Sequence, residues 1–332
     1  ILLIMKDWLI DTNVLIIFFV RDDILAKTFE SVKQARPRRL LLWQDGAREG
    51  CQDDIESIER CRQIVENIDW DCEVYKNYQT RNWGCDPSTF YSHKWAFTIV
   101  DKCIILEDDC VPSQSFYPFC KELLDKYEND TRINRICGFN NEEITKYCPY
   151  DYFFTQGGSV WGWATWKRVA DTWEEDYSFV NNRYEMDLLQ QVIDRDYKQV
   201  FKKLSRHIGL GRPFWESINT YSRLLGHQLV IVPKHSLVTN VGISENSTHS
   251  SGNIKELSSH AKYLLSMSSY EIDGPIKHPK YVVSDVGYYN RISKEHYLAD
   301  KIESTLRRLA QGNIKSVCIG FFRATGFIKN DI

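Results

Sequence analysis

The chain contains 332 residues, of which 43% are hydrophobic and 26% are charged, and these proportions are ordinary for a folded globular protein. This length is sufficient for one large domain or two smaller ones, each with a buried core. The formal net charge is −3, whereas proteins that bind nucleic acid usually carry a strongly positive net charge. No nucleic-acid partner is therefore expected.

Strand-like and helix-like patterns alternate along the first part of the chain. Residues 13–20, "NVLIIFFV", are apolar without alternation, as in strands that are buried on both faces of a parallel sheet. Further strands are predicted at 38–43, 72–78 and 102–106, and helices at 22–35, 55–68, 88–100 and 116–127. Successive strand–helix pairs predict an α/β fold with a mostly parallel sheet flanked by helices on both faces.

Beyond residue 133 the alternation is less regular. Strands are predicted at 133–140 and 227–233, a loop that enters a helix at 211–226, and a polar loop at 236–252. Residues 152–168 contain three glycines and three tryptophans. Two of these, Trp163 and Trp166, also fit one face of a helix, so they are candidates for the core as well as for a site.

Three consecutive carboxylates, Glu107, Asp108 and Asp109, follow the apolar run at 102–106 directly. Open α/β sheets bind their ligands at the carboxyl ends of parallel strands, which is where this triplet is expected. Mg²⁺ and Mn²⁺ prefer oxygen ligands and typically use one or two carboxylates together with substrate phosphates. The triplet therefore predicts a divalent-cation site, with an ordinary solvated acidic turn as the alternative.

Several segments resemble, in the same order, the motifs of nucleotide-sugar glycosyltransferases with the Rossmann-like GT-A fold. The segment "CIILEDDCVPSQSFYPF" (103–119) is similar to the acidic metal motif of the family that includes the N-acetylglucosaminyltransferase initiating complex N-glycans and its bacterial relatives. The other matching segments are "VLIIFFVRDD", "LLLWQDG", "GSVWGWATWKR", "PFWESI" and "SLVTNVGISENSTHS". The resemblance extends over residues 13–252 and implies a GT-A sheet with a C-terminal helical extension.

The resemblance assigns roles on the side of the sugar donor. It implies that Asp109 binds the metal ion directly, and that Glu107 and Asp108 lie beside the ribose and the donor sugar. The residues that it places around the uridine are Arg21, Asp45 and Asn82.

The resemblance also assigns roles around the acceptor. It implies that Glu216 is the general base that deprotonates the acceptor hydroxyl, and that Trp163 and Trp215 border the sugar pocket. It places His249 near the diphosphate, on a loop that closes over the donor. Glu216 stands where the compared family member has Asp, and without the resemblance it is an ordinary acid in the first turn of a helix.

These assignments predict a catalytic domain over residues 10–255, with a nucleotide-sugar half at 10–140 and an acceptor half at 141–255, and an extension over 256–332. The implied activity is metal-dependent, inverting transfer of a sugar from a UDP-sugar to an oligosaccharide or lipid-linked glycan, with Mn²⁺ or Mg²⁺ as cofactor. Bacterial surface polysaccharide synthesis is the expected setting.

Two alternatives remain open. A nucleotidyltransferase that makes nucleotide sugars would also combine a parallel sheet with acids, but residues 20–27 lack the glycine of the usual phosphate loop. A non-catalytic carbohydrate-binding protein would use the tryptophans and would need neither the triplet nor Glu216.

The cysteine pattern and the composition of residues 304–330 bear on the cellular location of the protein. The ten cysteines are scattered without zinc-ligand spacing, so reduced thiols and a cytoplasmic protein are expected. No apolar run has the length of a membrane span. Residues 304–330 combine basic and apolar residues without an acid, which predicts either a peripheral membrane contact or a docked terminal helix.

Overall fold

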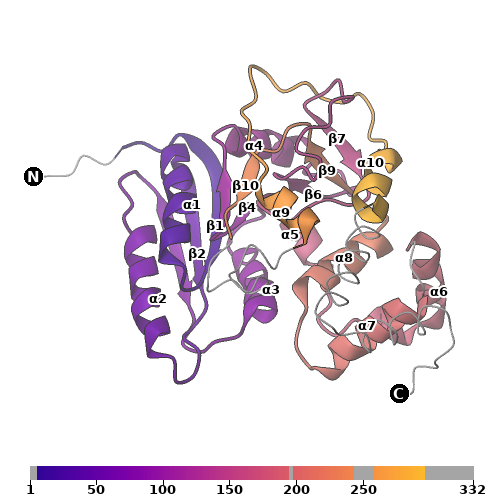
Figure 1. Cartoon of the computed structure of the whole chain (residues 1–332), viewed down its shortest axis with the longest axis horizontal. Helices are drawn as coiled ribbons and strands as arrows, with labels where there is room; N and C mark the ends of the chain where they lie inside the picture. The colour runs from indigo at the N-terminus through magenta and orange to yellow at the C-terminus, as the bar shows by residue number, and fades with distance from the viewer. Residues whose placement is uncertain (1–5, 194–196, 243–257, 296–332) are drawn as a thin grey trace, which may run out of the picture.

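The computed structural model describes residues 6–193, 197–242 and 258–295, and its core is one eight-stranded sheet (Figure 1). The strands lie in the order β3-β2-β1-β4-β8-β6-β9-β7. They span β1 (Ile10–Phe18), β2 (Pro37–Gln44), β3 (Glu73–Tyr78), β4 (Lys102–Glu107), β6 (Ile133–Cys137), β7 (Tyr152–Thr155), β8 (Trp163–Trp166) and β9 (Leu229–Pro233). Only β7 and β8 run antiparallel to their neighbours in this sheet. The predicted mostly parallel α/β sheet is confirmed.

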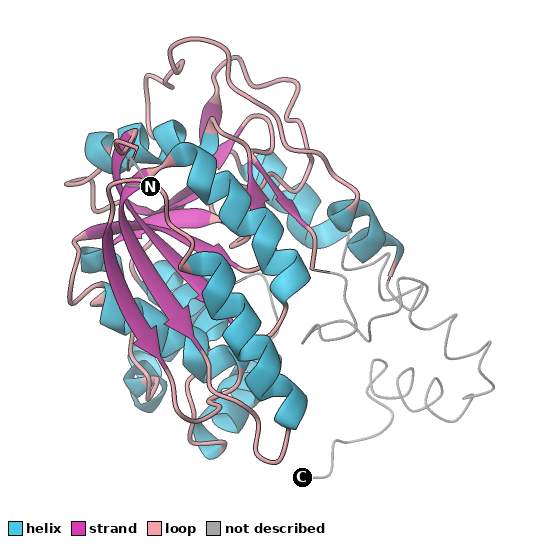
Figure 2. Ribbon diagram, turned by 90° about the vertical axis from the view of Figure 1, so that its left-hand side faces the viewer, coloured by secondary structure: helices cyan, strands magenta, loops and turns pink. Residues whose placement is uncertain are grey.

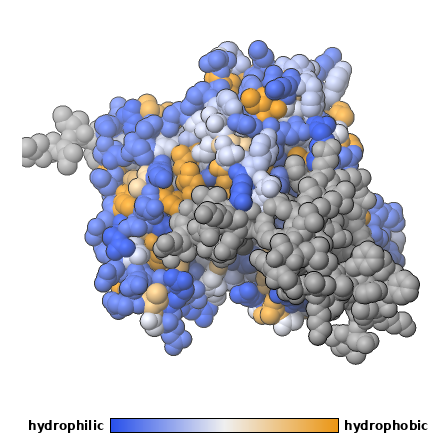
Figure 3. All heavy atoms as spheres, viewed as in Figure 1, coloured by the Kyte–Doolittle hydropathy of each residue, from blue (hydrophilic) through white to orange (hydrophobic). Residues whose placement is uncertain are grey.

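Helices cover both faces of the twisted sheet (Figure 2). They span α1 (Asp22–Ala35), α2 (Gln52–Val65), α3 (Cys85–Ala96), α4 (Phe116–Lys126), α5 (Lys167–Ala170), α6 (Arg183–Val192), α7 (Tyr197–Gly209), α8 (Trp215–Leu225), α9 (Ser259–Leu265) and α10 (Val286–Asn290). A 3₁₀ turn, η1 (Ser178–Asn181), precedes α6, and a π-helical turn, η3 (Arg291–Glu295), follows α10. Hydrophilic residues predominate over α1 and α2 at the left of Figure 3, as expected for helices that bury only one side.

Alternate residues of the central strands contribute to two separate cores. Val14, Ile16 and Phe18 of β1 pack in the layer that contains α1, α2 and α4. Leu15 and Ile17 pack in the layer that contains α3, α6 and α8. Because side chains alternate across a strand, a strand covered on both faces must be apolar at every position. This explains the uninterrupted apolar run at 13–20.

The structure corrects two local predictions. Trp163 and Trp166 do not share a helical face, because they belong to strand β8, and they enter opposite core layers. The region 236–252, predicted as a loop, contains the strand β10 (Val238–Asn240), which pairs antiparallel with β5 (Cys110–Pro112). Only three residues of β10 pair, so the strand leaves no clear pattern in the sequence.

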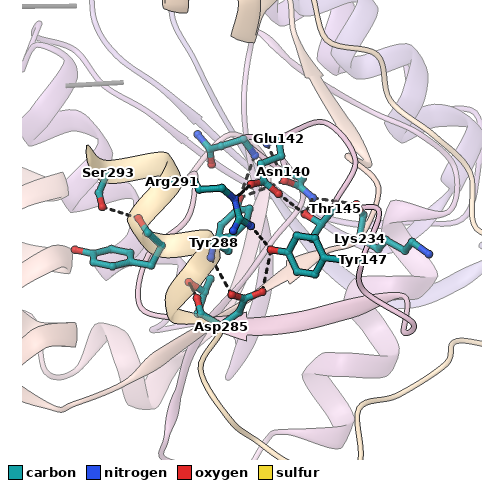
Figure 4. Close-up of polar contacts among 12 residues, drawn as sticks. Asn140, Glu142, Thr145, Tyr147, Lys234, Asp285, Tyr288, Arg291 and Ser293 are labelled. Atoms are coloured by element: carbon teal, nitrogen blue, oxygen red, sulfur yellow. Dashed lines mark hydrogen bonds and ion pairs between the residues drawn. The ribbon is translucent and has the colours of Figure 1, made fainter. Parts of the chain in front are cut away.

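The segment after residue 258 packs onto the β7 edge of the sheet. Tyr288 of α10 is fully buried, and its hydroxyl donates to Asn140 Oδ1 at 3.2 Å (Figure 4). In the same cluster, Arg291 Nε donates to Glu142 Oε1 at 2.5 Å, and Tyr147 donates to Asp285 Oδ2 at 3.0 Å. The predicted boundary between the catalytic domain and the extension, at residue 255, lies outside the described residues and stays a prediction.

The predicted membrane contact at 304–330 also lies outside the described residues. In the part of the chain that the structure describes, we find no helix with the length and apolarity needed to cross a bilayer.

Candidate active site

The acidic triplet lies at the carboxyl end of β4, in the middle of the sheet. Strand β4 ends at Glu107, and Asp108 and Asp109 form the turn into β5. Both aspartates are buried, with exposed fractions of 5% and 9%. Thr28 of α1 donates its hydroxyl to the Asp108 carbonyl at 2.7 Å, which fixes the turn against α1. The triplet is therefore a built site at a strand end and not a solvated acidic turn.

Arg21, at the start of α1, holds both aspartates. Its Nη2 pairs with Asp108 Oδ1 and donates to Asp109 Oδ2 at 3.0 Å, while Nε donates to Asp108 Oδ2 at 3.2 Å. Its Nη1 lies 3.5 Å from the carbonyl oxygen of Gly242. Although burial opposes the charge, these carboxylates raise the pKa of Arg21 above its usual value. Sequence reasoning placed Arg21 at the uridine, whereas the structure brings it to the acids.

One guanidinium leaves the triplet with an excess of negative charge. Burial, together with the charges of Asp109, Asp108 and Glu216, raises the pKa of Glu107 to about 8. Burial also raises the pKa of Asp108 to about 6, against the opposing effect of Arg21. Carboxylates with raised pKa values in one cluster indicate that the site would gain from a further positive charge.

The donor chemistry of the site fits a divalent cation that also binds phosphate. Asp108 and Asp109 present carboxylate oxygens of the kind that Mg²⁺ and Mn²⁺ prefer. Within the described residues, no group of three or more His, Cys, Asp or Glu side chains is arranged to hold a metal ion. Asp109 as the direct ligand stays a prediction.

The strand β10 adds a residue that the sequence did not indicate. Asn240 Nδ2 donates to Asp109 Oδ1 at 3.1 Å, and Val241 N donates to the Asp109 carbonyl at 2.9 Å. A Cβ at Gly242 would overlap Asp109 Oδ2, so only glycine permits this close approach. His249 lies outside the described residues, and its predicted role stays untested.

Asp45 and Asn82 come together beyond the ends of β2 and β3. Asn82 Nδ2 lies 3.2 Å from Asp45 Oδ2, and the backbone amides of Trp83 and Gly84 donate to the same carboxylate at 2.9 and 3.0 Å. Burial raises the pKa of Asp45, against the lowering effect of these amides. Asp45 thus holds the 82–84 loop in place, and contact with uridine stays a prediction for both residues.

The two loops touch so closely that a side chain would not fit between them. A Cβ at Gly46 would lie 2.5 Å from the backbone of Arg81. The guanidinium of Arg81 lies over the ring of Trp83, 3.6 Å from its centre. The pair of loops therefore forms a closely packed wall. Desolvation by the surrounding protein, together with the charge of Glu107, raises the pKa of the Cys85 thiol, which follows this wall.

Glu216 lies in the first turn of α8, and its side chain is exposed. Its charge is among those that raise the pKa of Glu107, so the two acids share one electrostatic environment. The structure thus brings Glu216 to the triplet from a segment about a hundred residues away in the sequence.

The tryptophans lie beneath this site and not on its surface. Trp163 and Trp215 have exposed fractions of 1% and 3%, and both rings stack with His93, at centroid distances of 5.3 and 5.6 Å, and with each other at 6.2 Å. Trp173 also contacts His93, at 5.2 Å. Burial lowers the pKa of His93 to about 4, so the imidazole is neutral. We therefore assign Trp163 and Trp215 to the floor of the site, where they support α8.

No protein-family model and no curated protein matches the sequence. Solved structures with a similar chain path include a UDP-glucose pyrophosphorylase in complex with UDP-glucose, at 9% identity, 68% coverage of this chain, 90% of that chain and a TM-score of 0.34. A 4-diphosphocytidyl-2C-methyl-D-erythritol synthase from Anaerococcus prevotii matches at 11% identity, with 59% and 84% coverage and a TM-score of 0.28. A cytidylyltransferase from Leptospira borgpetersenii matches at 11% identity, with 65% and 74% coverage and a TM-score of 0.29. These structures are nucleotidyltransferases and not GT-A glycosyltransferases. With TM-scores this low, they do not decide between reactions.

Proposed function

We propose that this protein is an enzyme that acts on a nucleotide-activated sugar and transfers the sugar to a hydroxyl group. The observation that carries the proposal is the Glu107–Asp109 triplet at the carboxyl end of β4 in a mostly parallel sheet, close enough to Glu216 for that charge to add to the effect of burial in raising the pKa of Glu107. A donor with a diphosphate leaving group needs positive charge on one side, and an acceptor hydroxyl needs a base on the other. Arg21 at the triplet and Glu216 on α8 are the groups that we propose for these two tasks.

On the donor side, the proposed substrate is a UDP-sugar. Asp109, with Asp108, would hold a Mn²⁺ or Mg²⁺ ion, which when bound neutralises the charge that develops on the diphosphate. Arg21 already neutralises part of the charge of these acids and lies in position to contact a phosphate. The wall formed by residues 45–46 and 81–84 would bind the nucleoside, with Asp45 fixing its shape.

On the acceptor side, Glu216 would accept the proton of the attacking hydroxyl. A single displacement from the face opposite the leaving group inverts the anomeric carbon, as in the base half of an inverting glycosidase. Because Glu216 is exposed, it can meet an acceptor that approaches from solvent. An oligosaccharide or lipid-linked glycan is the proposed acceptor class.

Nucleotidyl transfer that makes nucleotide sugars is the second candidate. A cation held by Asp108 and Asp109 would serve attack on a nucleoside triphosphate equally well, and the similar structures described above have this type of activity. The absence of glycine from residues 20–27 and the position of Glu216 favour sugar transfer.

The deciding experiment measures two products in parallel. Purified protein with Mn²⁺ is incubated either with a panel of UDP-sugars, while UDP release is followed, or with UTP and a hexose 1-phosphate, while pyrophosphate release is followed. We expect UDP from at least one sugar, and joint stabilisation by UDP and Mn²⁺ of about 2.7 kcal/mol when ligand is at about 100 times its dissociation constant.

Pyrophosphate without UDP would replace sugar transfer by nucleotidyl transfer. Binding of free sugars without either product would instead indicate a non-catalytic carbohydrate-binding protein.

A further inference from the structure

Two arginines are buried together where β6 meets α8, on the side of the sheet that carries Glu216. Arg135 of β6 and Arg223 of α8 have exposed fractions of 5% and 6%. No carboxylate of the described residues forms an ion pair with either of them, whereas Arg21 pairs with two. Arginine stays protonated in proteins, so both sites carry a full positive charge in a buried place.

A chain of hydrogen bonds connects the two side chains. Arg223 Nη1 lies 3.5 Å from the carbonyl oxygen of Gln228, and Gln228 Oε1 accepts from Asn134 Nδ2 at 3.0 Å. Asn134 Oδ1 in turn accepts from Arg135 Nη1 at 3.3 Å. The two guanidiniums therefore belong to one polar cluster. Their positive charges repel each other, and the repulsion is strong because the surroundings are buried and of low polarity.

Several polar atoms of this cluster have no partner. The Nε atoms of Arg135 and Arg223 and the Oδ1 atom of Asn219, one turn earlier on α8, are buried without a hydrogen bond. Arg135 makes one further bond, from Nη2 to the Gly158 carbonyl at 2.9 Å. Cys137 lies beside both arginines, but burial raises the pKa of its thiol, so it supplies no negative charge.

Another partly buried arginine shows how the chain satisfies such a group by itself. Arg168 also lacks a carboxylate partner, but its guanidinium donates to the carbonyl oxygens of Tyr127, Glu128, Asp130 and Ile133 at 2.9–3.2 Å. Arg135 and Arg223 have no comparable set of acceptors. An unpaired buried charge lowers the stability of the folded protein by several kcal/mol. A negative charge from outside the described residues would therefore stabilise the protein if it bound at this cluster.

We propose that Arg135 and Arg223 bind a small anion between β6 and α8, of the size of a halide ion, as a second ligand site of this protein. The anion would accept from both guanidiniums and cancel their repulsion. It would also tie α8, which begins with Trp215 and Glu216, to the central sheet. The site is independent of the proposed transfer reaction and would be present whatever the reaction is.

The first test uses the wild-type protein and bromide as the probe. We expect crystals soaked in sodium bromide to show an anomalous peak between the two guanidiniums. We also expect the melting temperature to rise by about 2 °C or more in sodium bromide or chloride relative to sodium gluconate at equal ionic strength, because gluconate is too large to enter. No bromide peak together with equal melting temperatures in all three salts would overturn the proposal.

The second test uses matched variants. Arg223→Met removes one guanidinium and keeps an apolar stem, so the difference between bromide and gluconate should disappear. Arg132→Met removes an exposed arginine that pairs with Asp130 at 2.6 Å, and it should keep the full difference. If Arg223→Met keeps the difference, the anion binds elsewhere and the assignment is wrong. If Arg223→Met does not fold, the anomalous peak in the wild type decides.

Discussion

The carboxyl end of β4 and the contact between β6 and α8 differ in the sign of their unbalanced charge. At β4, three consecutive carboxylates meet one guanidinium, that of Arg21. Between β6 and α8, two buried guanidiniums meet no carboxylate among the described residues. A charge that the fold leaves unbalanced in a buried place is costly, so each region indicates a ligand of opposite sign: a cation at the first and an anion at the second.

The comparison also separates the two regions by role. The first lies at the edge where α/β sheets bind substrates, and its acids have pKa values raised by one another as well as by burial. The second is buried between β6 and α8, the helix that carries Glu216, and would hold that helix in place. The first is therefore our candidate for the reacting site, and the second our candidate for a structural support of α8.

We expect the largest effect from Asp109→Asn in the acidic triplet, which should lower turnover by more than about 10³-fold. A bound cation supplies several kcal/mol of charge stabilisation in the transition state, and the amide is a much weaker ligand. The variant is nearly isosteric, so its melting temperature should stay close to that of the wild type. Asp125→Asn, on the surface of α4, serves as the control and should keep full activity. EDTA should inactivate the wild type, and normal turnover in EDTA would exclude the metal.

His93 of α3 offers a second test, because its buried ring stacks with Trp163 of β8 and with Trp215 at the start of α8, the helix that carries Glu216. Burial lowers its pKa to about 4 from a usual value of 6.5. The unfolded chain therefore binds a proton that the folded chain does not, and stability should fall as the pH is lowered from 6.5 towards 4. The loss from this residue alone is on the order of 3 kcal/mol.

Urea unfolding at several pH values measures this loss. His93→Asn keeps a donor for the Thr89 carbonyl but does not titrate, so its stability should depend less on pH in the same window. His227→Asn changes an exposed histidine with a positive φ of 48°, which Asn tolerates, and should behave as the wild type. Equal slopes for His93→Asn and the wild type would show that His93 titrates freely.

Glu216→Gln tests the proposed base and should lower turnover by at least about 10²-fold, the low end for a general base. Affinity for the UDP-sugar should change little, because the proposal places Glu216 on the acceptor side. Glu56→Gln, an exposed acid on α2, is the control. A nearly normal rate would move the base elsewhere. Wild-type product with the same anomeric configuration as the donor would exclude a single displacement.

The smallest expected effect concerns the wall beside the triplet. Gly46→Ala should destabilise the protein by about 2 kcal/mol, because the new methyl group would lie 2.5 Å from the Arg81 backbone. It should also weaken binding of UDP. Gly209→Ala, at the end of α7 with no atom within 4 Å of the new methyl group, should be neutral or stabilising. If both variants have equal stability, the two loops are not in contact.

Local patterns in the sequence were sufficient for the α/β class and for most of its elements. Helices α1 and α4 and strand β2 lie within about a residue of their predicted positions. A helix buried on one side repeats its apolar residues about every 3.6 positions, a strand buried on one face repeats them every two, and a strand buried on both faces is apolar throughout. Helix α3 begins at Cys85, three residues before its predicted start, because Asp86 and Pro87 suit the first turn of a helix. The placement of Glu107–Asp109 at a strand end followed from the same patterns.

Pairings between distant segments were decided only by the tertiary structure. The sequence indicated Arg21 as a site residue but not as a partner of Asp109, and it did not indicate Asn240. Both residues bind Asp109, which lies 88 and 131 residues away in the sequence. Trp163 and Trp166 were assigned a common helical face, since a spacing of three residues fits a helix; in β8 the same spacing separates them to opposite faces.

The sequence by itself therefore determined which segments are strands or helices and that three acids end a buried strand. Strand order, which no local period encodes, decided the rest. By inserting the antiparallel β8 between β4 and β6, the sheet separates the acidic triplet at the end of β4 from Arg135 on β6. Whether a charge finds a partner depends on that order, because a buried side chain is balanced only by groups within a few ångströms, whatever their distance along the chain.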